Sequence, residues 1–346
     1  MPAGPLTDAS ILALQTEILE LMAKRRVPGV AIAMIHSGKR PRTQSFGVKN
    51  VRTNEPVTNE TIFEAASLSK PAFTYGVLKL VDQGKLGLDV PLTTYLPKPY
   101  VQRDERLGKI TARIVLSHRT GFPNWRGDGP LTIHFTPGER FSYSGEGYVY
   151  LQRVVEQITG TELNTYMTSA VFKPLGMTSS SYVWRPDFDS QSATGHNAAG
   201  EPVSLWKPNE AGAASTLNTT ASDYALFLEA VLHRRGLKAA TFREMEKPQI
   251  ALDPECRNCL ERAPKQLSKS LFWGLGWGIQ RTEKGDALWH WGDNNVFKAF
   301  VIASPKTKDA LALFANSENG MAIARPITAQ ALGAEPLAFQ WLKYDS

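Results

Sequence analysis

The chain has 346 residues, of which 42% are hydrophobic, and 39 Lys and Arg against 33 Asp and Glu give it a formal charge of +6. At roughly 150 residues per domain, this length fits two domains or one large domain with a substantial core. The apolar content and the presence of only two cysteines exclude a disordered chain, a collagen and a disulfide scaffold. No apolar run approaches the ~18 residues of a membrane span, so none is predicted.

The positive charge is scattered along the chain. Its small clusters, Lys24–Arg26 and Arg234–Arg235, come without zinc-finger spacing or a basic repeat, so nucleic-acid binding is not expected. Met1–Pro5 is not a basic stretch leading into an apolar core, so no export signal is predicted. The protein is then cytoplasmic as the chain stands, or periplasmic or secreted if a signal peptide has been removed. The sequence does not show which of these compartments is correct, and it does not predict the oligomeric state.

The predicted elements fall into three stretches. Apolar residues at helical spacing predict a helix over 8–26, and two strands at 30–35 and 43–48 form a hairpin around Gly38. The middle of the chain is mostly helical, with helices over 71–83, 112–118, 147–159, 163–172 and 222–233. Four β-rich runs follow at 273–280, 287–291, 298–303 and 310–315, and a helix over 322–332 closes the chain.

This order predicts an α+β fold in which strands from both chain ends form one antiparallel sheet flanked by helices. The sheet region comprises residues 1–60 and 270–346, and residues 61–269 form a large, mostly helical inserted region. The groove between the two regions is where we expect the active site.

Two S-x-x-K tetrapeptides are candidates for nucleophilic chemistry. Ser204 and Lys207 lie in a proline-flanked stretch without helical pattern and are interpreted as a loop. Ser67 instead begins the helix that runs to residue 83, which sets Lys70 one turn away on the same face. The helix N-terminus favours an alkoxide and a developing oxyanion, so Ser67 is predicted to be an activated nucleophile. The alternative is an N-cap serine beside a solvated lysine.

Two later stretches strengthen the catalytic interpretation. Tyr143 precedes the 147–159 helix on a loop, and His290-Trp291-Gly292 ends a strand, where the glycine allows close approach of a ligand. Each alone is more often structural. In this order after Ser67-x-x-Lys70, the segments resemble the S-x-x-K, Y-x-N and K-T-G or H-x-G motifs of the penicillin-recognising serine hydrolases.

Further segments resemble the branch of that family that contains class C β-lactamases, D-aminopeptidases and family VIII esterases. The resemblance covers nearly the whole chain and implies the β-lactamase/transpeptidase-like fold. The matching segments are Leu116–Pro123, Thr136–Gly138 leading into Phe141–Ser144, Pro174–Met177, and Ala213–Thr216 leading into Asp223.

The resemblance implies acyl-enzyme chemistry without a metal or organic cofactor. Ser67 would attack a carbonyl carbon, and Lys70 and Tyr143 would together act as the base, with the nearby ammonium lowering the pKa of the phenol. The oxyanion would lie between the backbone N–H groups of Ser67 and Asp293. Water would then release the acyl group.

Three departures from the motifs bear on the substrate. Gly145 replaces the asparagine of Y-x-N, while His290 and Trp291 replace the lysine and threonine of K-T-G. Together with Gly292 and Asp293, these residues form the predicted oxyanion and substrate-binding set. The changes favour a neutral or amphipathic ester over a substrate with an obligatory carboxylate.

The leading hypothesis is therefore a serine hydrolase that is a carboxylesterase of family VIII type with weak or no β-lactamase activity. A D-stereospecific peptidase or amidase, or a β-lactamase, is an alternative of the same class. A non-turnover penicillin-binding protein and an acyl-transfer protein are alternatives of other classes. In each case the partner is a small-molecule ester, amide or lactam.

Two further features have open interpretations. Numerous tryptophans, among them Trp125, Trp184, Trp206, Trp273 and Trp277, either line an aromatic pocket or pack the core. Cys256 and Cys259 form a C-x-x-C that is a poor zinc site, and an inert thiol pair or a local disulfide is favoured over a redox motif. The surrounding stretch, Asp253–Lys269, is predicted to be a surface excursion near the groove.

Overall fold

The computed structural model describes residues 8–332 and 336–344. The segment Met1–Pro5, for which no export signal is predicted, lies outside the described residues. Among those described, no helix is both long and apolar enough to cross a membrane.

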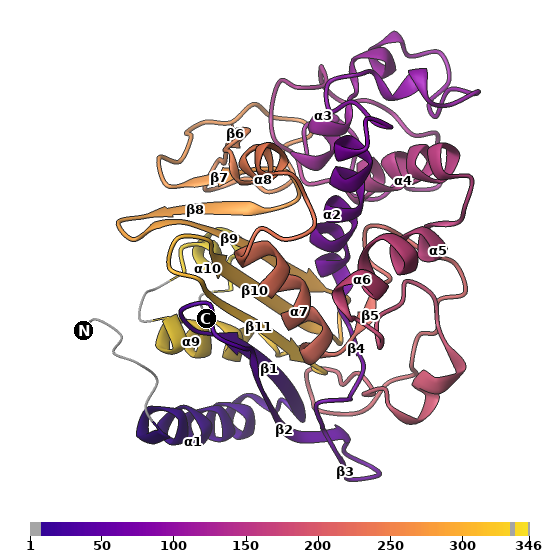
Figure 1. Ribbon diagram of the computed structural model, residues 1–346. Coiled ribbons are helices and arrows are strands. Elements are labelled where there is room, and N and C mark those ends of the chain that lie inside the picture. The colour runs from indigo at the N-terminus through magenta and orange to yellow at the C-terminus, as the bar shows by residue number, and fades with distance from the viewer. Residues whose placement is uncertain (1–7, 333–335, 345–346) are drawn as a thin grey trace.

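A nine-stranded sheet forms the centre of the molecule (Figure 1). Its order is β3-β2-β1-β11-β10-β9-β8-β7-β6, and all its neighbouring strands are antiparallel. The strands are β1 (Gly29–Ile35), β2 (Arg42–Asn50), β3 (Glu55–Pro56), β6 (Ile250–Ala251), β7 (Leu271–Trp273), β8 (Gly278–Thr282), β9 (Gly285–Asp293), β10 (Lys298–Ser304) and β11 (Asp309–Ala315). A separate two-stranded sheet pairs β4 (Phe63–Glu64) with β5 (Asn218–Thr219).

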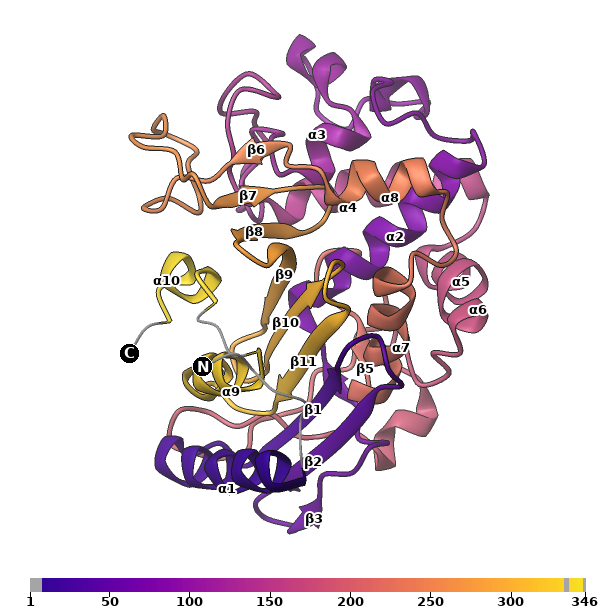
Figure 2. The same cartoon turned by 60° about the vertical axis from the view of Figure 1, so that its left-hand side comes forward.

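The helices lie on both faces of the sheet. Figure 2 shows α1, α9 and α10 on one side of the strands and α2 and α7 on the other. The α-helices are α1 (Asp8–Arg25), α2 (Ser69–Asp82), α3 (Ala112–Leu116), α4 (Gly145–Thr159), α5 (Leu163–Met167), α6 (Lys173–Leu175), α7 (Ala221–Leu232), α8 (Ala239–Glu246), α9 (Met321–Leu332) and α10 (Ala338–Leu342). The shorter helical turns are η1 (Ala66–Leu68), η2 (Leu92–Thr94), η3 (Glu105–Lys109), η4 (Thr168–Phe172) and η5 (Pro186–Ser190).

Each face of the sheet has its own hydrophobic core. Strand β1 shows this directly, because its alternate residues point to opposite faces. Ala31, Ala33 and Ile35 pack into the core shared with the helical region, whereas Val30, Ile32 and Met34 pack into the core under the terminal helices. Burial on both faces explains why this strand is a continuous apolar run. The predicted α+β fold, with an antiparallel sheet built from both chain ends, is confirmed.

The expected strand over 273–280 is wrong, because this segment is a hairpin of β7 and β8. Gly274 donates a backbone hydrogen bond to Trp277 O (2.8 Å), which closes the turn. Gly276 has a positive φ of 75°, and a Cβ there would lie 2.1 Å from Thr74 Oγ1. The turn therefore needs glycine both for its backbone conformation and for its contact with α2.

The edge strand β6 comes from residues expected in the inserted region. Ile250 pairs with Trp273 and Ala251 with Phe272, so the sheet extends into the segment before residue 270. The division at 60 and 269 stays a prediction.

Candidate active site

Ser67 lies in the short turn η1, directly before α2, rather than inside the long helix. The preceding Ala66 has a left-handed backbone conformation (φ 49°), which costs an alanine about 1–2 kcal/mol. Hydrogen bonds hold this strained turn in place: Ser69 Oγ donates to Ala66 O (2.6 Å), and Ala65 N donates to Leu217 O (2.8 Å). The turn leaves Ser67 half-buried and on the wall of a cavity.

Lys70 contacts the hydroxyl of Ser67 directly. Its Nζ donates to Ser67 Oγ (3.0 Å) and to Ala214 O (2.8 Å), and the side chain is fully buried. Burial lowers the pKa of Lys70 to about 7, because the ammonium loses its hydration. A lysine in this state can accept a proton from serine at neutral pH. The second bond also shows what the segment Ala213–Thr216 contributes: the backbone carbonyl of Ala214 accepts a hydrogen bond from Lys70. From the sequence this segment was only a match to the family.

Tyr143 completes the cluster from the loop before α4. The Lys70 Nζ lies 4.8 Å from the centre of its ring, and its hydroxyl faces Ser67 without a well-formed hydrogen bond. Burial raises the pKa of Tyr143, against a smaller lowering effect of Ser67. The expectation that an ammonium lowers this pKa is therefore wrong in direction. Burial favours the neutral form of both side chains, so Lys70 offers little positive charge to stabilise a phenolate.

His118 supports the Tyr143 loop from behind. The two rings lie 4.2 Å apart, and the Ser144 N–H donates to His118 Nδ1 (3.0 Å). Burial, followed by the charge of Lys70, holds the pKa of His118 well below its usual range. The neutral imidazole thus acts as a hydrogen-bond acceptor that positions the loop.

The end of β9 lies against the turn that carries Ser67. A Cβ on Gly292 would come within 2.4 Å of Ala65 O, so only glycine permits this approach. His290 is fully buried, and burial lowers its pKa to about 3. Asp293 and Trp291 line the same cavity as Ser67 and Tyr143. The structure thus brings the predicted serine, lysine, tyrosine and β9 segment together, while the oxyanion role of the two backbone N–H groups stays a prediction.

Gly145 is covered by a neighbouring loop. A Cβ at this position would lie 2.8 Å from the Trp125 ring and 3.0 Å from Asn124 O. Gly145 N donates to Asn124 Oδ1 (2.9 Å), and Glu146 N donates to Asn124 O (2.9 Å). The missing asparagine of the motif therefore leaves no hole, because Trp125 fills the space.

The cavity has a volume of about 580 Å³ and a wall of mixed polarity. Trp125, Trp206 and Trp291 line it, whereas Trp273 and Trp277 are fully buried core residues. Trp184 lies elsewhere and donates to Asp189 (2.8 Å). Of the five tryptophans expected at the pocket or in the core, two are thus pocket residues.

Glu64 is a buried carboxyl on the cavity wall that the sequence interpretation missed. Asn294 Nδ2 donates to Glu64 Oε2 (2.8 Å), yet burial outweighs this bond and raises the pKa of Glu64 to about 7. Its position three residues before Ser67 was visible in the sequence. Its burial depends on β4 pairing with β5, which spans about 150 residues of chain and has no local signal.

The second S-x-x-K is a loop, as predicted. Residues 203–208 have no regular secondary structure, and Lys207 pairs with Asp189 (2.6 Å) rather than with Ser204. Cys256 and Cys259 form a disulfide with each other. Of the two favoured interpretations, an inert thiol pair and a local disulfide, the disulfide is therefore confirmed.

The family model Beta-lactamase matches residues 14–334, so the chain belongs to the β-lactamase family, whose members with this fold are serine hydrolases. The chain is 23% identical over 335 residues to the protein flp of Staphylococcus aureus strain MRSA252, covering 90% of this chain and 64% of that protein. It is 26% identical to penicillin-binding protein 4 of Amycolatopsis lactamdurans, covering 86% of this chain and 82% of the relative.

Solved structures show the same fold. The octameric penicillin-binding protein homologue from Pyrococcus abyssi has a TM-score of 0.77 at 24% identity, over 96% of this chain and 79% of that one. The β-lactamase/D-alanine carboxypeptidase from Pseudomonas syringae has a TM-score of 0.79 at 20% identity, over 95% and 100% of the two chains.

Proposed function

We propose that the protein is a carboxylesterase of family VIII type that forms an acyl-enzyme on Ser67. The observation that carries this proposal is the 3.0 Å hydrogen bond between Nζ of the buried Lys70 and Oγ of Ser67. Ser67 lies on the wall of a cavity. A neutral Lys70 takes the serine proton as Ser67 Oγ attacks the carbonyl carbon. Tyr143, which burial keeps protonated and which lies beside Lys70, then donates its proton to the leaving alkoxide and recovers one from Lys70.

The second half of the reaction reverses these roles. Water attacks the acyl-enzyme and gives up a proton to the Lys70–Tyr143 pair, and Ser67 Oγ takes a proton as it leaves. The N–H groups of Ser67 and Asp293 would stabilise the oxyanion in both halves.

The choice of an ester rests on what surrounds the nucleophile. His290 is neutral at physiological pH, so a β-lactam carboxylate would meet no positive charge at the position of the K-T-G lysine. Gly145 offers no side-chain amide to a substrate amide. Esters also have better leaving groups than amides and need less assistance. A D-stereospecific peptidase or amidase, a β-lactamase, a non-turnover penicillin-binding protein and an acyl-transfer protein are the competing outcomes of the test.

The test combines labelling with turnover. A fluorophosphonate probe should add one adduct to the wild type, seen by intact-mass spectrometry, and none to Ser67→Ala. Ser204→Ala is the matched control, because it removes the serine of the second S-x-x-K, and it should still be labelled. Hydrolysis of p-nitrophenyl butyrate should exceed that of a D-alanyl anilide and of nitrocefin.

Other outcomes identify the alternatives. Labelling of Ser67→Ala would refute the assignment of Ser67 as the nucleophile. A stable adduct without turnover would indicate a sensor, and product that depends on an added alcohol or amine would indicate acyl transfer. Faster hydrolysis of the anilide or of nitrocefin would replace the esterase by a peptidase or a β-lactamase.

A further inference from the structure

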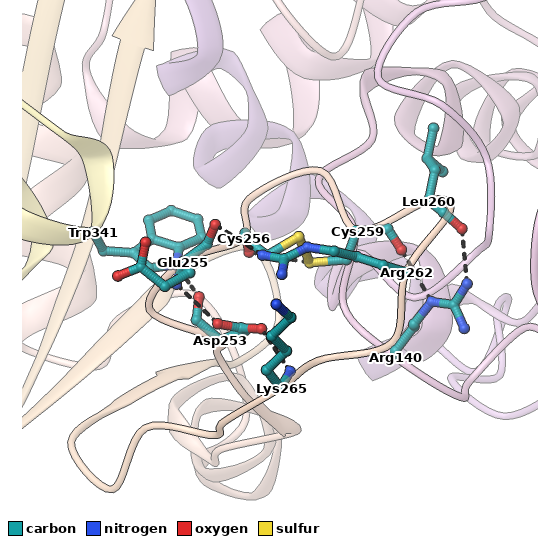
Figure 3. Close-up of a disulfide and its surroundings, with 9 residues drawn as sticks. All are labelled: Arg140, Asp253, Glu255, Cys256, Cys259, Leu260, Arg262, Lys265 and Trp341. Carbon is teal, nitrogen blue, oxygen red and sulfur yellow. Dashed lines mark hydrogen bonds between the residues drawn. A yellow bond between two sulfur atoms is a disulfide. The ribbon is translucent and has the colours of Figure 1, made fainter.

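The segment Asp253–Lys269, here called the disulfide loop, is cross-linked by the Cys256–Cys259 disulfide, and Figure 3 shows Arg140 and Trp341 reaching it from other parts of the chain. Arg140 donates to Cys259 O (3.0 Å) and to Leu260 O (2.7 Å). Trp341 Nε1 donates to Asp253 O (2.9 Å) at the start of the loop. Inside the loop, Tyr143 N donates to Arg257 O (2.9 Å), so the backbone that carries Arg257 is bonded to the backbone of the candidate catalytic tyrosine.

This fastening places the Arg257 side chain on the wall of the cavity that holds Ser67 and Tyr143. A guanidinium keeps its charge throughout the pH range in which proteins are folded. The other cationic candidates near Ser67 are weaker, since Lys70 is buried with a pKa of about 7 and His290 is neutral. Among the residues that line the cavity, Arg257 is the one with a permanent positive charge.

Among the described residues, Arg257 forms no ion pair that would neutralise its charge. No carboxylate there lies within ion-pair distance of its guanidinium, which is beside the Tyr344 hydroxyl. The nearby Asp293 carboxylate is already held by Lys298 Nζ (2.5 Å), the Tyr344 hydroxyl (2.7 Å) and Asn295 N (2.9 Å). A guanidinium that has no ion pair among the described residues and lies on a cavity wall is suited to bind an anion, and its planar fork matches a carboxylate.

We propose that Arg257 is a specificity-determining residue that binds a carboxylate carried by the substrate a few bonds from the scissile carbonyl. The proposal rests on the esterase function above and narrows it to anionic esters. The anion is recognised from the disulfide loop, not from the position of His290. Because the backbone of the loop is bonded to Tyr143, the anion site and the candidate proton donor are held at a fixed separation.

Two substrate pairs test the proposal. In the first, 4-nitrophenyl hydrogen glutarate is compared with its methyl-capped neutral counterpart, which places the charge on the acyl side. In the second, the propionate ester of 4-hydroxybenzoate is compared with that of methyl 4-hydroxybenzoate, which places it on the leaving side. For at least one pair, Arg257→Gln should lower kcat/KM for the charged ester by about tenfold or more and change the neutral ester by less than about twofold.

Two further variants complete the design. Arg257→Lys should restore part of the lost charge preference. Arg262→Gln removes an exposed arginine of the same loop, whose Nη2 donates to Glu255 O (3.2 Å), and should leave both pairs unchanged. An equal loss for charged and neutral esters in Arg257→Gln, or no loss in either pair, would overturn the anion site. Absence of turnover of all four esters by the wild type would instead count against the esterase function.

Discussion

Lys70 and Tyr143 share a dry environment that removes charge from both. Burial lowers the pKa of the lysine to about 7 and raises that of the tyrosine, so above pH 7 the pair is mainly an amine beside a phenol. In the proposed mechanism, a proton taken from Ser67 goes to the lysine, and the phenol then donates its own proton. The Lys70 Nζ lies 4.8 Å from the centre of the Tyr143 ring, and burial is the largest cause of both pKa shifts.

This charge state predicts the pH dependence of acylation. Below pH 7 Lys70 gains a proton and can no longer act as the base, so kcat/KM for p-nitrophenyl butyrate should fall about tenfold per pH unit there. The histidines do not account for such a limb, because burial holds the pKa values of His118 and His290 below this range. A pH–rate profile measures it, and a flat profile between pH 5 and 7 would contradict a lysine base.

Glu64 titrates in the same range and has its own signature in stability. Its folded-state pKa of about 7 lies above the ordinary value of 4.5, so the folded protein binds more protons than the unfolded chain between these pH values. Stability from this group is therefore present at pH 4.5 and is lost as the pH rises to 7.

The variant Glu64→Gln separates the two groups. It should remove this pH-dependent loss, which is of the order of 3 kcal/mol at most, while the limb of the rate profile assigned to Lys70 remains. Urea denaturation at pH 5 and pH 8 provides the measurement. An unchanged difference between the two pH values in the variant would show that Glu64 is not the group responsible.

Gly145 shows how a residue can differ from its motif without leaving a gap. Because a Cβ at this position would lie 2.8 Å from the Trp125 ring, Gly145→Asn should destabilise the protein by about 1–3 kcal/mol. The double variant Gly145→Asn, Trp125→Gly should recover part of that loss. Equal stability of Gly145→Asn and the wild type in urea denaturation would mean that the tryptophan moves aside freely.

Among the elements, the loop of the Cys256–Cys259 disulfide makes the least predictable contribution to the site. Its contact with Tyr143 is a backbone hydrogen bond, from Tyr143 N to Arg257 O, which no side-chain pattern announces. The helices and most strands were predictable because their apolar residues repeat with the period of the element. The β7–β8 hairpin was not predicted, because Trp273 and Trp277 are both apolar and continue the apolar run across the turn. The glycines between them were not interpreted as a turn, which Gly274 N closes on Trp277 O and which Gly276 fits against Thr74.

The residues of the candidate site also fall into two groups, those that the sequence predicted and those that it did not. Ser67 and Lys70 are one helical turn apart, so local spacing predicted their contact. The motifs led to Tyr143 and His290, although not to their burial. Glu64, Asn124 and Arg257 line the cavity through tertiary contacts, and no local pattern in the sequence predicts those contacts.

Opening the disulfide should disturb the candidate catalytic tyrosine. In Cys256→Ser, Cys259→Ser the loop loses its cross-link and holds Tyr143 N less firmly, so kcat for p-nitrophenyl butyrate should fall by roughly tenfold. The wild type treated with a reductant should show the same loss, whereas the variant should not respond to the reductant. An unchanged kcat would show that the other contacts of the loop suffice to position Tyr143.

At the scale of the whole molecule, the C-terminal helix joins parts that are distant in sequence. Trp341 on α10 is buried against Phe141, Trp289 and Trp291, with ring centres 5.6–5.9 Å away, and its indole N–H bonds Asp253 O. One side chain thus contacts the tyrosine loop, strand β9 and the disulfide loop, three segments that line or support the cavity. The sheet and the helical region are held together at the site by this aromatic cluster as well as by the chain itself.

Two variants of Trp341 distinguish packing from the hydrogen bond. Trp341→Ala should lower the free energy of unfolding by about 3–5 kcal/mol, because it leaves a cavity in the cluster. Trp341→Phe retains a ring but removes one of the two hydrogen bonds that Asp253 O accepts, the other coming from Cys256 N (3.2 Å), and should cost about 1 kcal/mol for the lost bond. If the two variants were equally stable in urea denaturation, ring packing would contribute nothing beyond the hydrogen bond. Since the segments held by Trp341 carry Tyr143 and Trp291, kcat for p-nitrophenyl butyrate should fall further in the alanine variant than in the phenylalanine variant, even where both are fully folded.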